Sequence, residues 1–430
     1  MIENFDRQYA VARDADDPLL RYRHKFSMED ESLIYLDGNS LGRLPRETML
    51  KVQDSIKEEW GRGLIRSWNA DWYEMSQRMG AKIARLIGAD PEEVIMADSV
   101  SVGLYKLAYG ALKLKPGRTE ILSDDMNFPS DLYVLQGLLG QIGEREGRTC
   151  SLRLLKSPDG INSGVTDMLR LLGKQTALVS LSLVAFKSAY MYDLPRVTEM
   201  AQLHGALTLW DLSHAVGAVP IDLHAANVDL AVGCTYKYLS GGPASPAFLY
   251  IRRDLQEAME NPIKGWFGHN DPFEFNLHYR PARGIRKFLT SSPSVLAMKA
   301  VEPGLDLVLD AGIEAIRAKS MAQTQYLVDL AREKLFKLGF RLGSPEFADR
   351  RGSHVSLKHP EAYRICRALI DPELGDYEVI PDFREPNNIR LGLAPLYTSF
   401  EEIWLAVEQL RSIMEERSYE RYSLHKQMVT

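Results

Sequence analysis

Asp211 and Lys237 are the two residues whose types and positions most directly suggest chemistry. Each follows a short apolar run, residues 205–210 before the acid and 228–235 before the lysine, so each is expected where a buried strand ends. Ligands of open α/β sheets bind at the carboxyl ends of the strands. An acid and a lysine at this edge suit pyridoxal phosphate, which forms a Schiff base with a lysine and whose pyridinium nitrogen pairs with a carboxylate.

Two neighbouring residues distinguish this pair from a surface lysine and a strand-capping acid, the ordinary explanation of an isolated Asp/Lys pair. His214 follows Asp211 closely enough to cover a bound ring, and Tyr236 directly precedes Lys237. Burial disfavours the ammonium form of a lysine, which frees its amine to attack an aldehyde. The sequence therefore predicts a cofactor-binding enzyme.

The elements that must position these residues alternate between strands and helices from about residue 90 to residue 300. This alternation predicts an α/β fold with one mostly parallel sheet covered on both faces, and an antiparallel strand at 247–251. Helices are expected over 45–60, from Val295 onward, and over 303–338. Shorter strands after residue 338, at 353–357 and 377–380, predict a smaller α+β domain.

This pattern predicts three parts of the chain. Residues 1–45 form an N-terminal segment that packs with the small domain, residues 46–300 form the large cofactor-binding domain, and residues 301–430 form the small C-terminal α+β domain.

The serines after the predicted strand at 94–96 have two explanations that the sequence leaves open. Ser99 and Ser101 could simply cap the helix that begins there. The amino terminus of a helix also binds phosphate, and a strand, a serine-rich turn and a helix in succession are the right setting for it. Further along, Phe128 could stack on an aromatic ring.

The totals exclude several classes of function. A net charge of −6 offers no basic surface for nucleic acid, and no run of 18 apolar residues could span a membrane. The three cysteines are scattered and lack the paired spacing of a metal site, so no metal is expected. The acidic first residues lack the apolar core of a signal peptide, which makes the cytoplasm the expected setting.

Several stretches together resemble one family, the kynureninases, within the fold-type I, class V aminotransferase-like pyridoxal-phosphate enzymes. They recur in order over nearly the whole chain: Tyr35-Leu-Asp-Gly-Asn-Ser-Leu-Gly42, Phe128-Pro-Ser-Asp131, Asp211-Leu-Ser-His-Ala-Val-Gly217, Tyr236-Lys-Tyr-Leu239, Gly265-Trp-Phe-Gly-His269 and Ile389-Arg-Leu-Gly-Leu-Ala-Pro-Leu-Tyr397. The last two stretches are the more particular to kynureninases. The resemblance implies a homodimeric hydrolase with active sites at the subunit interface. It would cleave L-kynurenine, or its 3-hydroxy analogue, to anthranilate and L-alanine in tryptophan catabolism.

The resemblance also implies a role for individual residues. The catalytic group would be Lys237 as the Schiff-base lysine, with Tyr236 and Asp131 as proton carriers. Cofactor contacts would come from Val100, Ser101, Phe128, Ser130, Asp131, Ser182, Asp211, His214, Tyr236 and Lys237, with Trp266 and Ser292 supplied by the other subunit. Arg390 would clamp the substrate α-carboxylate, and Ser40 and Trp68 would border the aryl-ketone side chain.

Three positions depart from the family pattern and bear on the substrate more than on the cofactor: Ala-Phe-Lys-Ser-Ala at 185–189, Gly103, and Ser-Ser-Pro at 291–293. They leave a rival reaction open on the same scaffold, such as β-elimination, desulfuration or side-chain modification in secondary metabolism. A binding protein that had lost its cofactor would need a changed Lys237 or Asp211, and neither is changed.

Overall fold

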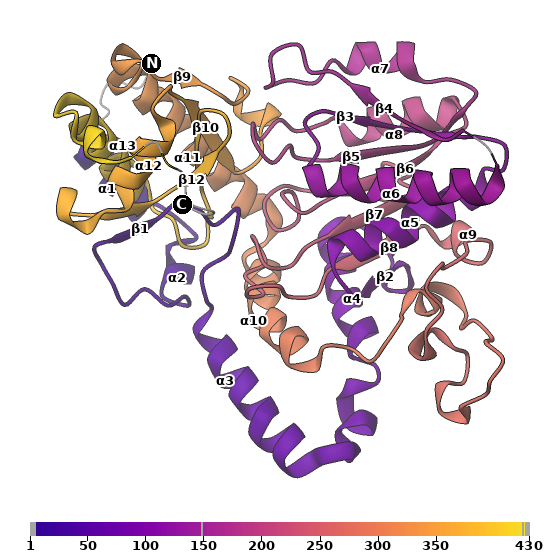
Figure 1. The fold of residues 1–430 in the computed structure, drawn as a ribbon. Coiled ribbons are helices and arrows are strands. Elements are labelled where there is room, and N and C mark those ends of the chain that lie inside the picture. Colours follow the sequence, from indigo (N-terminus) through magenta and orange to yellow (C-terminus); the bar gives the residue numbers. More distant parts are fainter. Residues whose placement is uncertain (1–5, 148, 424, 426–430) are drawn as a thin grey trace.

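A seven-stranded sheet forms the centre of the larger part of the molecule in the computed structural model, which describes residues 6–147, 149–423 and 425 (Figure 1). Its strand order is β2-β8-β7-β6-β5-β3-β4. The five strands from β4 to β7 pair in parallel, whereas β8 pairs antiparallel with both β7 and β2. The predicted mostly parallel sheet with an antiparallel strand at 247–251 is thus confirmed. The strands are β2 (Val94–Met96), β3 (Glu120–Asp124), β4 (Ser151–Leu155), β5 (Thr176–Ser182), β6 (Leu207–Asp211), β7 (Leu230–Gly233) and β8 (Phe248–Ile251).

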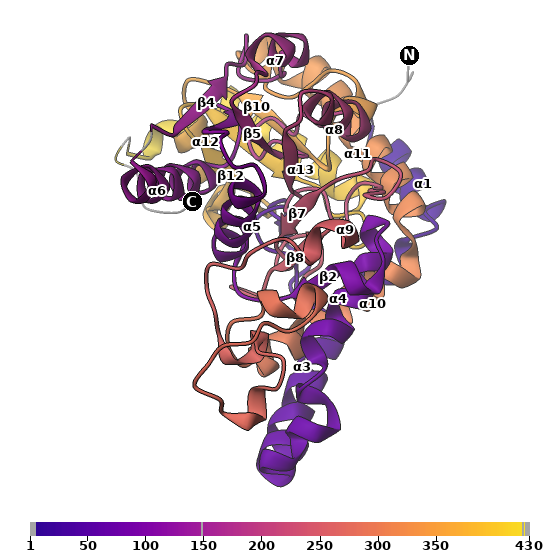
Figure 2. The ribbon, with the colours of Figure 1, turned by 90° about the vertical axis from the view of Figure 1, so that its right-hand side faces the viewer.

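Helices cover both faces of this sheet because successive strand residues point to opposite sides. Leu178 and Val179 are neighbours on β5, yet they belong to two different apolar cores. Figure 2 shows α5 (Val100–Leu114) and α6 (Pro129–Glu146) on one side. On the other side lie α4 (Met75–Ile87), α8 (Leu194–Leu203) and α10 (Val295–Ala311). The shorter helices α7 (Val165–Leu171) and α9 (Arg253–Gln256) complete this part.

A second, antiparallel sheet of order β12-β13-β10-β9 organises the remainder of the chain. Its core is separate, and α11, α12 and α13 contribute to it. Asp14 of α1 accepts hydrogen bonds from the first two backbone amides of α13, and β1 pairs in parallel with β11, so the N-terminal segment packs here. The elements are α1 (Arg7–Ala15), α2 (Leu20–Arg23), β1 (Leu33–Tyr35), α11 (Ile313–Lys334), β9 (Arg341–Leu342), β10 (His354–Lys358), α12 (Ala362–Ile370), β11 (Glu378–Ile380), β12 (Asp382–Arg384), β13 (Asn388–Gly392) and α13 (Phe400–Glu415).

Two helix predictions were wrong in their bounds. The helix expected over 303–338 is two helices, α10 and α11, divided at Gly312, whose φ of 79° is unfavourable for other residues. The helix predicted from Val295 begins there, as α10, and it continues through Pro303. The helix expected over 45–60 is α3 (Arg46–Asp54), followed by π-helical turns over Ser55–Gly63. Together with residues 64–72, these turns form an arm that projects from the molecule (Figures 1 and 2).

Among the described residues, no helix is both long enough and apolar enough to cross a membrane.

Candidate active site

The carboxyl ends of β5, β6 and β7 open into a cavity of about 210 Å³ that both sheets help to enclose. The large sheet contributes the residues that follow β6 and β7, the small sheet contributes Arg384 and Arg390, and the turn after β1 contributes Asn39 and Ser40. The cavity is lined by Asn39, Ser40, Val100, Ser101, Phe128, Ser130, Asp131, Phe186, Asp211, Ser213, His214, Tyr236, Lys237, Arg384 and Arg390.

Lys237 lies in the cavity wall without a carboxylate partner at ion-pair distance among the described residues. Its Nζ is 3.2 Å from both ring nitrogens of His214, so this contact is not a directed hydrogen bond to either one. Burial lowers the pKa of Lys237. Burial therefore makes the amine of Lys237 easier to deprotonate than that of an exposed lysine.

The turn before Lys237 is fixed by a close backbone approach. Gly42 donates its backbone N–H to the carbonyl of Tyr236 at 2.8 Å, and a Cβ at Gly42 would lie 2.3 Å from the Lys237 carbonyl oxygen. A side chain at position 42 would push the two segments apart. The glycine that ends the Asp-Gly-Asn-Ser-Leu-Gly turn thus lets the N-terminal segment close on the lysine.

Asp211, the last residue of β6, is held in place by the residues around it. Its Oδ1 accepts the backbone N–H of Ser213 at 2.8 Å and the Ser213 hydroxyl at 2.5 Å. The hydroxyl of Ser182, paired with Asp211 across the strands, lies 3.5 Å from Oδ2 but has a nearer acceptor in Asn127 at 2.7 Å. Burial raises the pKa of Asp211, while Lys237 opposes that shift. Oδ2 is thus the oxygen with capacity for a bound group.

Two histidine rings lie side by side next to the lysine, tilted by 54° to each other. The ring of His214 lies 5.7 Å from that of His354, which belongs to β10 of the small sheet. Burial and the positive charge of Lys237 lower the pKa of His214 well below its ordinary value, and burial and Arg390 do the same for His354. Both rings are neutral at physiological pH. A cationic aromatic ring could therefore lie against them without charge repulsion.

Two buried polar groups facing this region lack hydrogen-bond partners within the described structure. They are Oδ2 of Asp131 and both ends of the Asn39 amide. Burial and the charge of Asp211 raise the pKa of Asp131 well above its ordinary value. An unsatisfied buried carboxyl costs free energy unless a bound molecule completes it.

The start of α5 supplies an anion site at the cavity. Ser99 is the N-cap of this helix, so the capping explanation holds for that serine. Val100 and Ser101 in the first turn line the cavity, and the Ser101 hydroxyl is 3.2 Å from that of Ser130. Backbone N–H groups and hydroxyls at a helix amino terminus suit a phosphate. Phe128 beside them is 42% exposed, which leaves its ring available for stacking.

Arg390 on β13 is surrounded by acids and carbonyls. Its Nη1 donates to the carbonyl of Phe186 at 2.6 Å and its Nη2 donates to the hydroxyl of Ser40 at 2.7 Å. Nη2 also lies 2.5 Å from Oδ2 of Asp382 and 3.9 Å from Oδ1 of Asp37. The predicted carboxylate clamp is thus in the cavity, but the protein's own carboxylates already contact it.

Four residues of the predicted site do not line this cavity. Ser182 lies behind Asp211 and donates to Asn127 at 2.7 Å. The ring of Trp68 packs 5.6 Å from that of Phe267, and Trp266 is partly exposed on the same loop. Ser292 is exposed. The single chain therefore does not bring Trp68, Trp266 and Ser292 to its own cavity.

Sequence reasoning assigned no role to four residues that line the cavity, namely Asn39, Phe186, Ser213 and Arg384. Asn39 and Ser213 fall within stretches that carry the family resemblance, so their positions were a usable signal. Phe186 lies in the stretch that departs from the family pattern, and its ring meets Phe128 edge-on at 5.2 Å. Arg384 reaches the cavity only through the pairing of β12 with β13, which no local pattern reveals.

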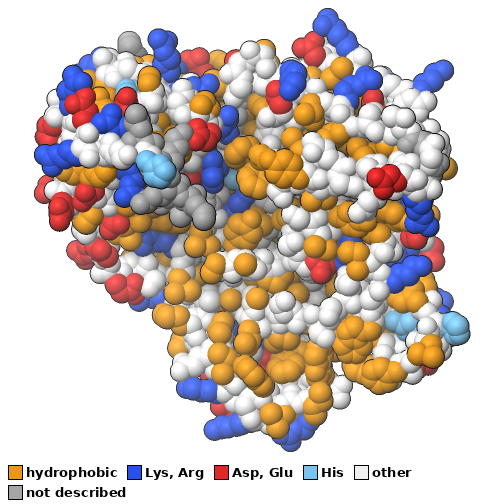
Figure 3. Space-filling model, in the orientation of Figure 1, with side chains coloured by type: hydrophobic (Ala, Val, Ile, Leu, Met, Phe, Trp, Pro, Cys, Tyr) orange, Lys and Arg blue, Asp and Glu red, His pale blue; other side chains and the backbone are white. Residues whose placement is uncertain are grey.

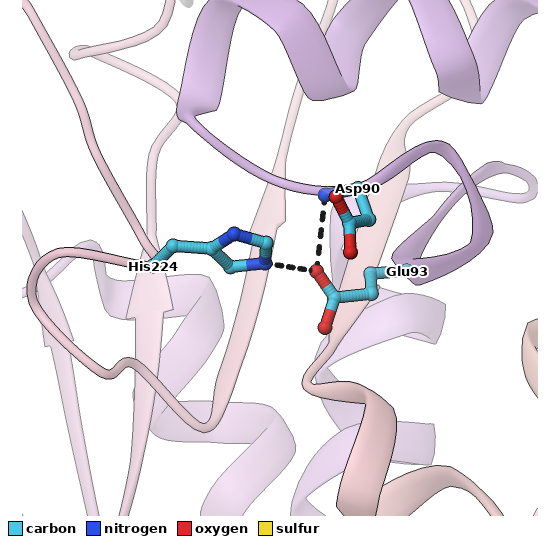
Figure 4. Close-up of side chains that lie close together, drawn as sticks. All are labelled: Asp90, Glu93 and His224. Carbon is cyan, nitrogen blue, oxygen red and sulfur yellow. Dashed lines mark hydrogen bonds and ion pairs between the residues drawn. The ribbon is translucent and has the colours of Figure 1, made fainter.

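A separate cluster of potential metal ligands lies away from this cavity, at Asp90, Glu93 and His224 (Figure 4). The Glu93 carboxylate of this cluster already makes hydrogen bonds to neighbouring groups. Oε2 of Glu93 accepts from the backbone of Asp90 at 3.1 Å and contacts the His224 ring at 2.5 Å, and Oε1 accepts from the backbone of Arg253 at 2.8 Å. Asp90 and Glu93 form a capping box, so the cluster is a structural hydrogen-bond network.

Comparison with known proteins identifies the class of enzyme to which the fold belongs. The sequence model of the aminotransferase class-V family matches residues 34–362. A cysteine desulfurase from Thermococcus onnurineus superposes with a TM-score of 0.79 at 17% identity, covering 92% of this chain and 98% of that one. The cystine C–S lyase C-DES in complex with cysteine persulfide gives 0.75 at 19% identity, covering 89% and 98%. The fold is that of the class V pyridoxal-phosphate enzymes.

Within this class the chain belongs to the kynureninase family. The model of the kynureninase C-terminal domain matches residues 316–410. The kynureninase of Burkholderia mallei is 42% identical over 418 residues, and that of Pseudomonas fluorescens is 40% identical over the same length. Each alignment covers 96% of both chains. The predicted family, fold class and cofactor class are thereby confirmed.

Proposed function

We propose that this protein is a pyridoxal-phosphate hydrolase that cleaves L-kynurenine to anthranilate and L-alanine. The observation that carries the proposal is the placement of Lys237, Asp211 and Arg390 around one cavity in a chain of the kynureninase family. A lysine, an acid and a guanidinium are the groups needed to hold the cofactor and an amino-acid carboxylate.

The residues of the cavity fit the cofactor. Lys237 would hold its aldehyde carbon, Oδ2 of Asp211 its ring nitrogen, and the start of α5 with Ser101 its phosphate. Phe128 would stack on the ring, with His214 as the other surface. The unsatisfied carboxyl of Asp131 supports this assignment, because a bound polar group would complete it.

When bound, the cofactor withdraws electrons from the α-carbon of the substrate. The protein residues then manage protons and position. The amine of Lys237 takes the proton from the α-carbon, and the Asp211 carboxylate keeps the proton on the ring nitrogen. Arg390 holds the α-carboxylate.

The bond that breaks joins the β-carbon to the ketone carbon. Water adds to the ketone carbon, which leaves as the carboxylate of anthranilate, and the β-carbon receives a proton to become the methyl group of alanine. Tyr236 is the proton carrier at that carbon, with Asp131 as its relay. Burial raises the pKa of the Tyr236 phenol, which keeps it protonated and able to donate.

We also infer that the protein is a homodimer with each site completed by its partner. Large apolar side chains are exposed on the projecting arm and on the loop near Trp266 (Figure 3), including Trp60, Ile65, Phe275 and Leu277. An exposed apolar surface of this extent is typical of a subunit interface. Trp68, Trp266 and Ser292 would reach the partner's cavity. We further propose a cytoplasmic setting, which the three free cysteines support.

The test is to mix the purified, cofactor-loaded protein with L-kynurenine, with its 3-hydroxy analogue and with L-cysteine. The proposal expects anthranilate fluorescence from the first and no sulfide from the last. Sulfide release without aryl-ketone cleavage would instead support the rival reaction on the same scaffold. For the dimer, the mass in solution should be twice that of the chain. A hybrid of Lys237→Ala and Trp266→Ala subunits should recover one working site.

A further inference from the structure

The carboxylate clamp of the cavity is part of a cluster of four charges. Arg390 and Asp382 face each other across the antiparallel pairing of β13 and β12. Oδ2 of Asp382 lies 2.5 Å from Nη2 of Arg390 and 2.9 Å from Nε of Arg384. One carboxylate oxygen therefore stands between two guanidinium groups. Asp37, 3.9 Å from Arg390, is the fourth member.

A substrate carboxylate cannot bind Arg390 fully while Asp382 stays where it is. A guanidinium grips a carboxylate best through two parallel N–H groups on one edge. On Arg390 the Nε group has no hydrogen-bond partner within the described structure. The Nη2 group beside it already contacts Asp382 and Ser40. On the edge of Arg390 that could hold a ligand carboxylate, Nε is thus free of described partners and Nη2 is occupied by the carboxylate of Asp382.

Arg384 is a second cation that Asp382 already contacts. The two residues lie on the same short strand, and both Arg384 and Arg390 line the cavity. Asp382 is 5% exposed, so leaving it without a cation would carry a large desolvation penalty. A small movement toward Arg384 would keep its charge balanced and release Nη2 of Arg390.

We propose that Arg384 is a positioning residue: Asp382 bridges Arg390 and Arg384 in the free site and shifts from Arg390 fully onto Arg384 when the substrate's α-carboxylate binds. The inference rests on the proposed function, in which Arg390 is the clamp. It gives Arg384 and Asp382 a joint role: the substrate's α-carboxylate binds Arg390 fully only when Asp382 shifts and Arg384 balances its charge.

The charge balance of the cluster supports this arrangement. Two acids and two arginines balance before the substrate binds, and the substrate adds a third carboxylate. Burial and repulsion by Asp382 raise the pKa of Asp37 to about 6, so this acid is the member that can take up a proton. The groups that influence Asp37 from the surrounding elements are Asp382, Arg384, Arg390, Ser40, Tyr35, Tyr238, Tyr397 and Cys366.

The experiment measures how strongly the loaded enzyme prefers a carboxylate. L-Alanine and L-alaninamide differ only in that group, and the binding of each is followed by the change in the visible spectrum of the holoenzyme. The ratio of their dissociation constants is compared at one pH in the wild type, Arg384→Gln, Arg384→Lys, Asp382→Asn and Arg384→Gln/Asp382→Asn. Arg341→Gln, an exposed arginine of the same sheet, is the matched control.

In Arg384→Gln, Asp382 should remain on Arg390, so the preference for alanine should fall roughly tenfold, the scale of one charge-assisted hydrogen bond, with alaninamide binding unchanged. KM for L-kynurenine should rise by a similar factor while kcat stays near wild type. Arg384→Lys should restore part of the preference. Adding Asp382→Asn should restore most of it, because the competing carboxylate is gone.

Two results would overturn the inference. One is an Arg384→Gln variant with the wild-type ratio. The other is a double variant that binds alanine more weakly than Arg384→Gln, which would mean that Asp382 only supports Arg390. A wild type without preference for alanine over alaninamide would instead count against Arg390 as the clamp, and so against the proposed function.

Discussion

Lys106 and Lys237 are two lysines in the interior of the larger part of the molecule, and their surroundings differ in every respect that matters for chemistry. Lys106 on α5 is fully buried. Its Nζ donates to Asp98 at 2.6 Å, to the carbonyl of Phe288 at 2.7 Å and to the hydroxyl of Thr290 at 2.5 Å. All three N–H donors of its ammonium are used.

Lys237 has neither full burial nor a set of acceptors. It is partly open to the cavity, and the one polar contact of its Nζ is with the face of a neutral histidine. Burial lowers the pKa of both lysines. At Lys106, Asp98 and two neutral acceptors compensate that cost and hold the charge. At Lys237 the nearby Cys234 and Asp211 also oppose the shift, but no described carboxylate pairs directly with Nζ. The acceptors that meet Nζ, together with the difference in burial, therefore separate the structural lysine from the reactive one.

The largest effect is expected from removing the reactive lysine. Lys237→Ala should lower turnover by at least about a thousandfold, because the variant loses both the cofactor linkage and the base. Its melting temperature should stay close to that of the wild type, since Lys237 makes no ion pair with any residue that the structure describes. Retained activity would place the cofactor lysine elsewhere.

Asp211→Asn tests the acid that accompanies Lys237. The amide cannot hold a proton on the ring nitrogen, so kcat should fall by roughly a hundredfold or more while the cofactor still binds. Steady-state kinetics with a cofactor-binding titration separate the two effects. Turnover within a fewfold of wild type would reduce Asp211 to a strand-end residue.

Lys106→Met tests the structural lysine and should give the opposite phenotype. Leaving Asp98 and two further acceptors without their cation should lower the free energy of unfolding by about 3 kcal/mol. The cofactor linkage to Lys237 should survive. Denaturant unfolding is the measurement, with the exposed Lys174→Met as control. A variant as stable as this control would show that Lys106 contributes nothing to the fold.

The smallest effect concerns Asp37, whose negative charge is unfavourable in the folded protein. Because the pKa of Asp37 is about 6 in the folded protein and lower when unfolded, the folded state binds the proton more tightly. Stability from this group is therefore present at low pH and lost as the pH rises through 6. Asp37→Asn should stabilise the protein by about 1–2 kcal/mol at pH 7 and by less at pH 4. Equal effects at both pH values would contradict the sign of this shift.

The local sequence was sufficient to predict that Asp211 and Lys237 lie at the ends of buried strands. The runs before Asp211 and Lys237 show their burial directly, and the register of β6 and β7 then brings the two ends together. Arg384 and Asp382 were out of reach because their role arises from pairing across β12 and β13. Lys106 appears in the sequence as an interruption of an apolar helix, and its three acceptors come from other segments.

Helix boundaries were the weakest part of the sequence prediction. Pro303 suggested the start of a helix, yet it lies inside α10. The true boundary is at Gly312, whose left-handed backbone ends α10 and begins α11. No local signal separated these two positions, because apolar helical spacing continues on both sides of the glycine.

Chemical trapping of the cofactor shows directly which lysine holds it. The purified protein is loaded with pyridoxal phosphate, treated with borohydride to fix the cofactor covalently on its lysine, digested and mapped by mass spectrometry. One modified peptide is expected, the one containing Lys237, with Lys106 unmodified. Modification of a different lysine, or no modification at all, would contradict Lys237 as the cofactor lysine.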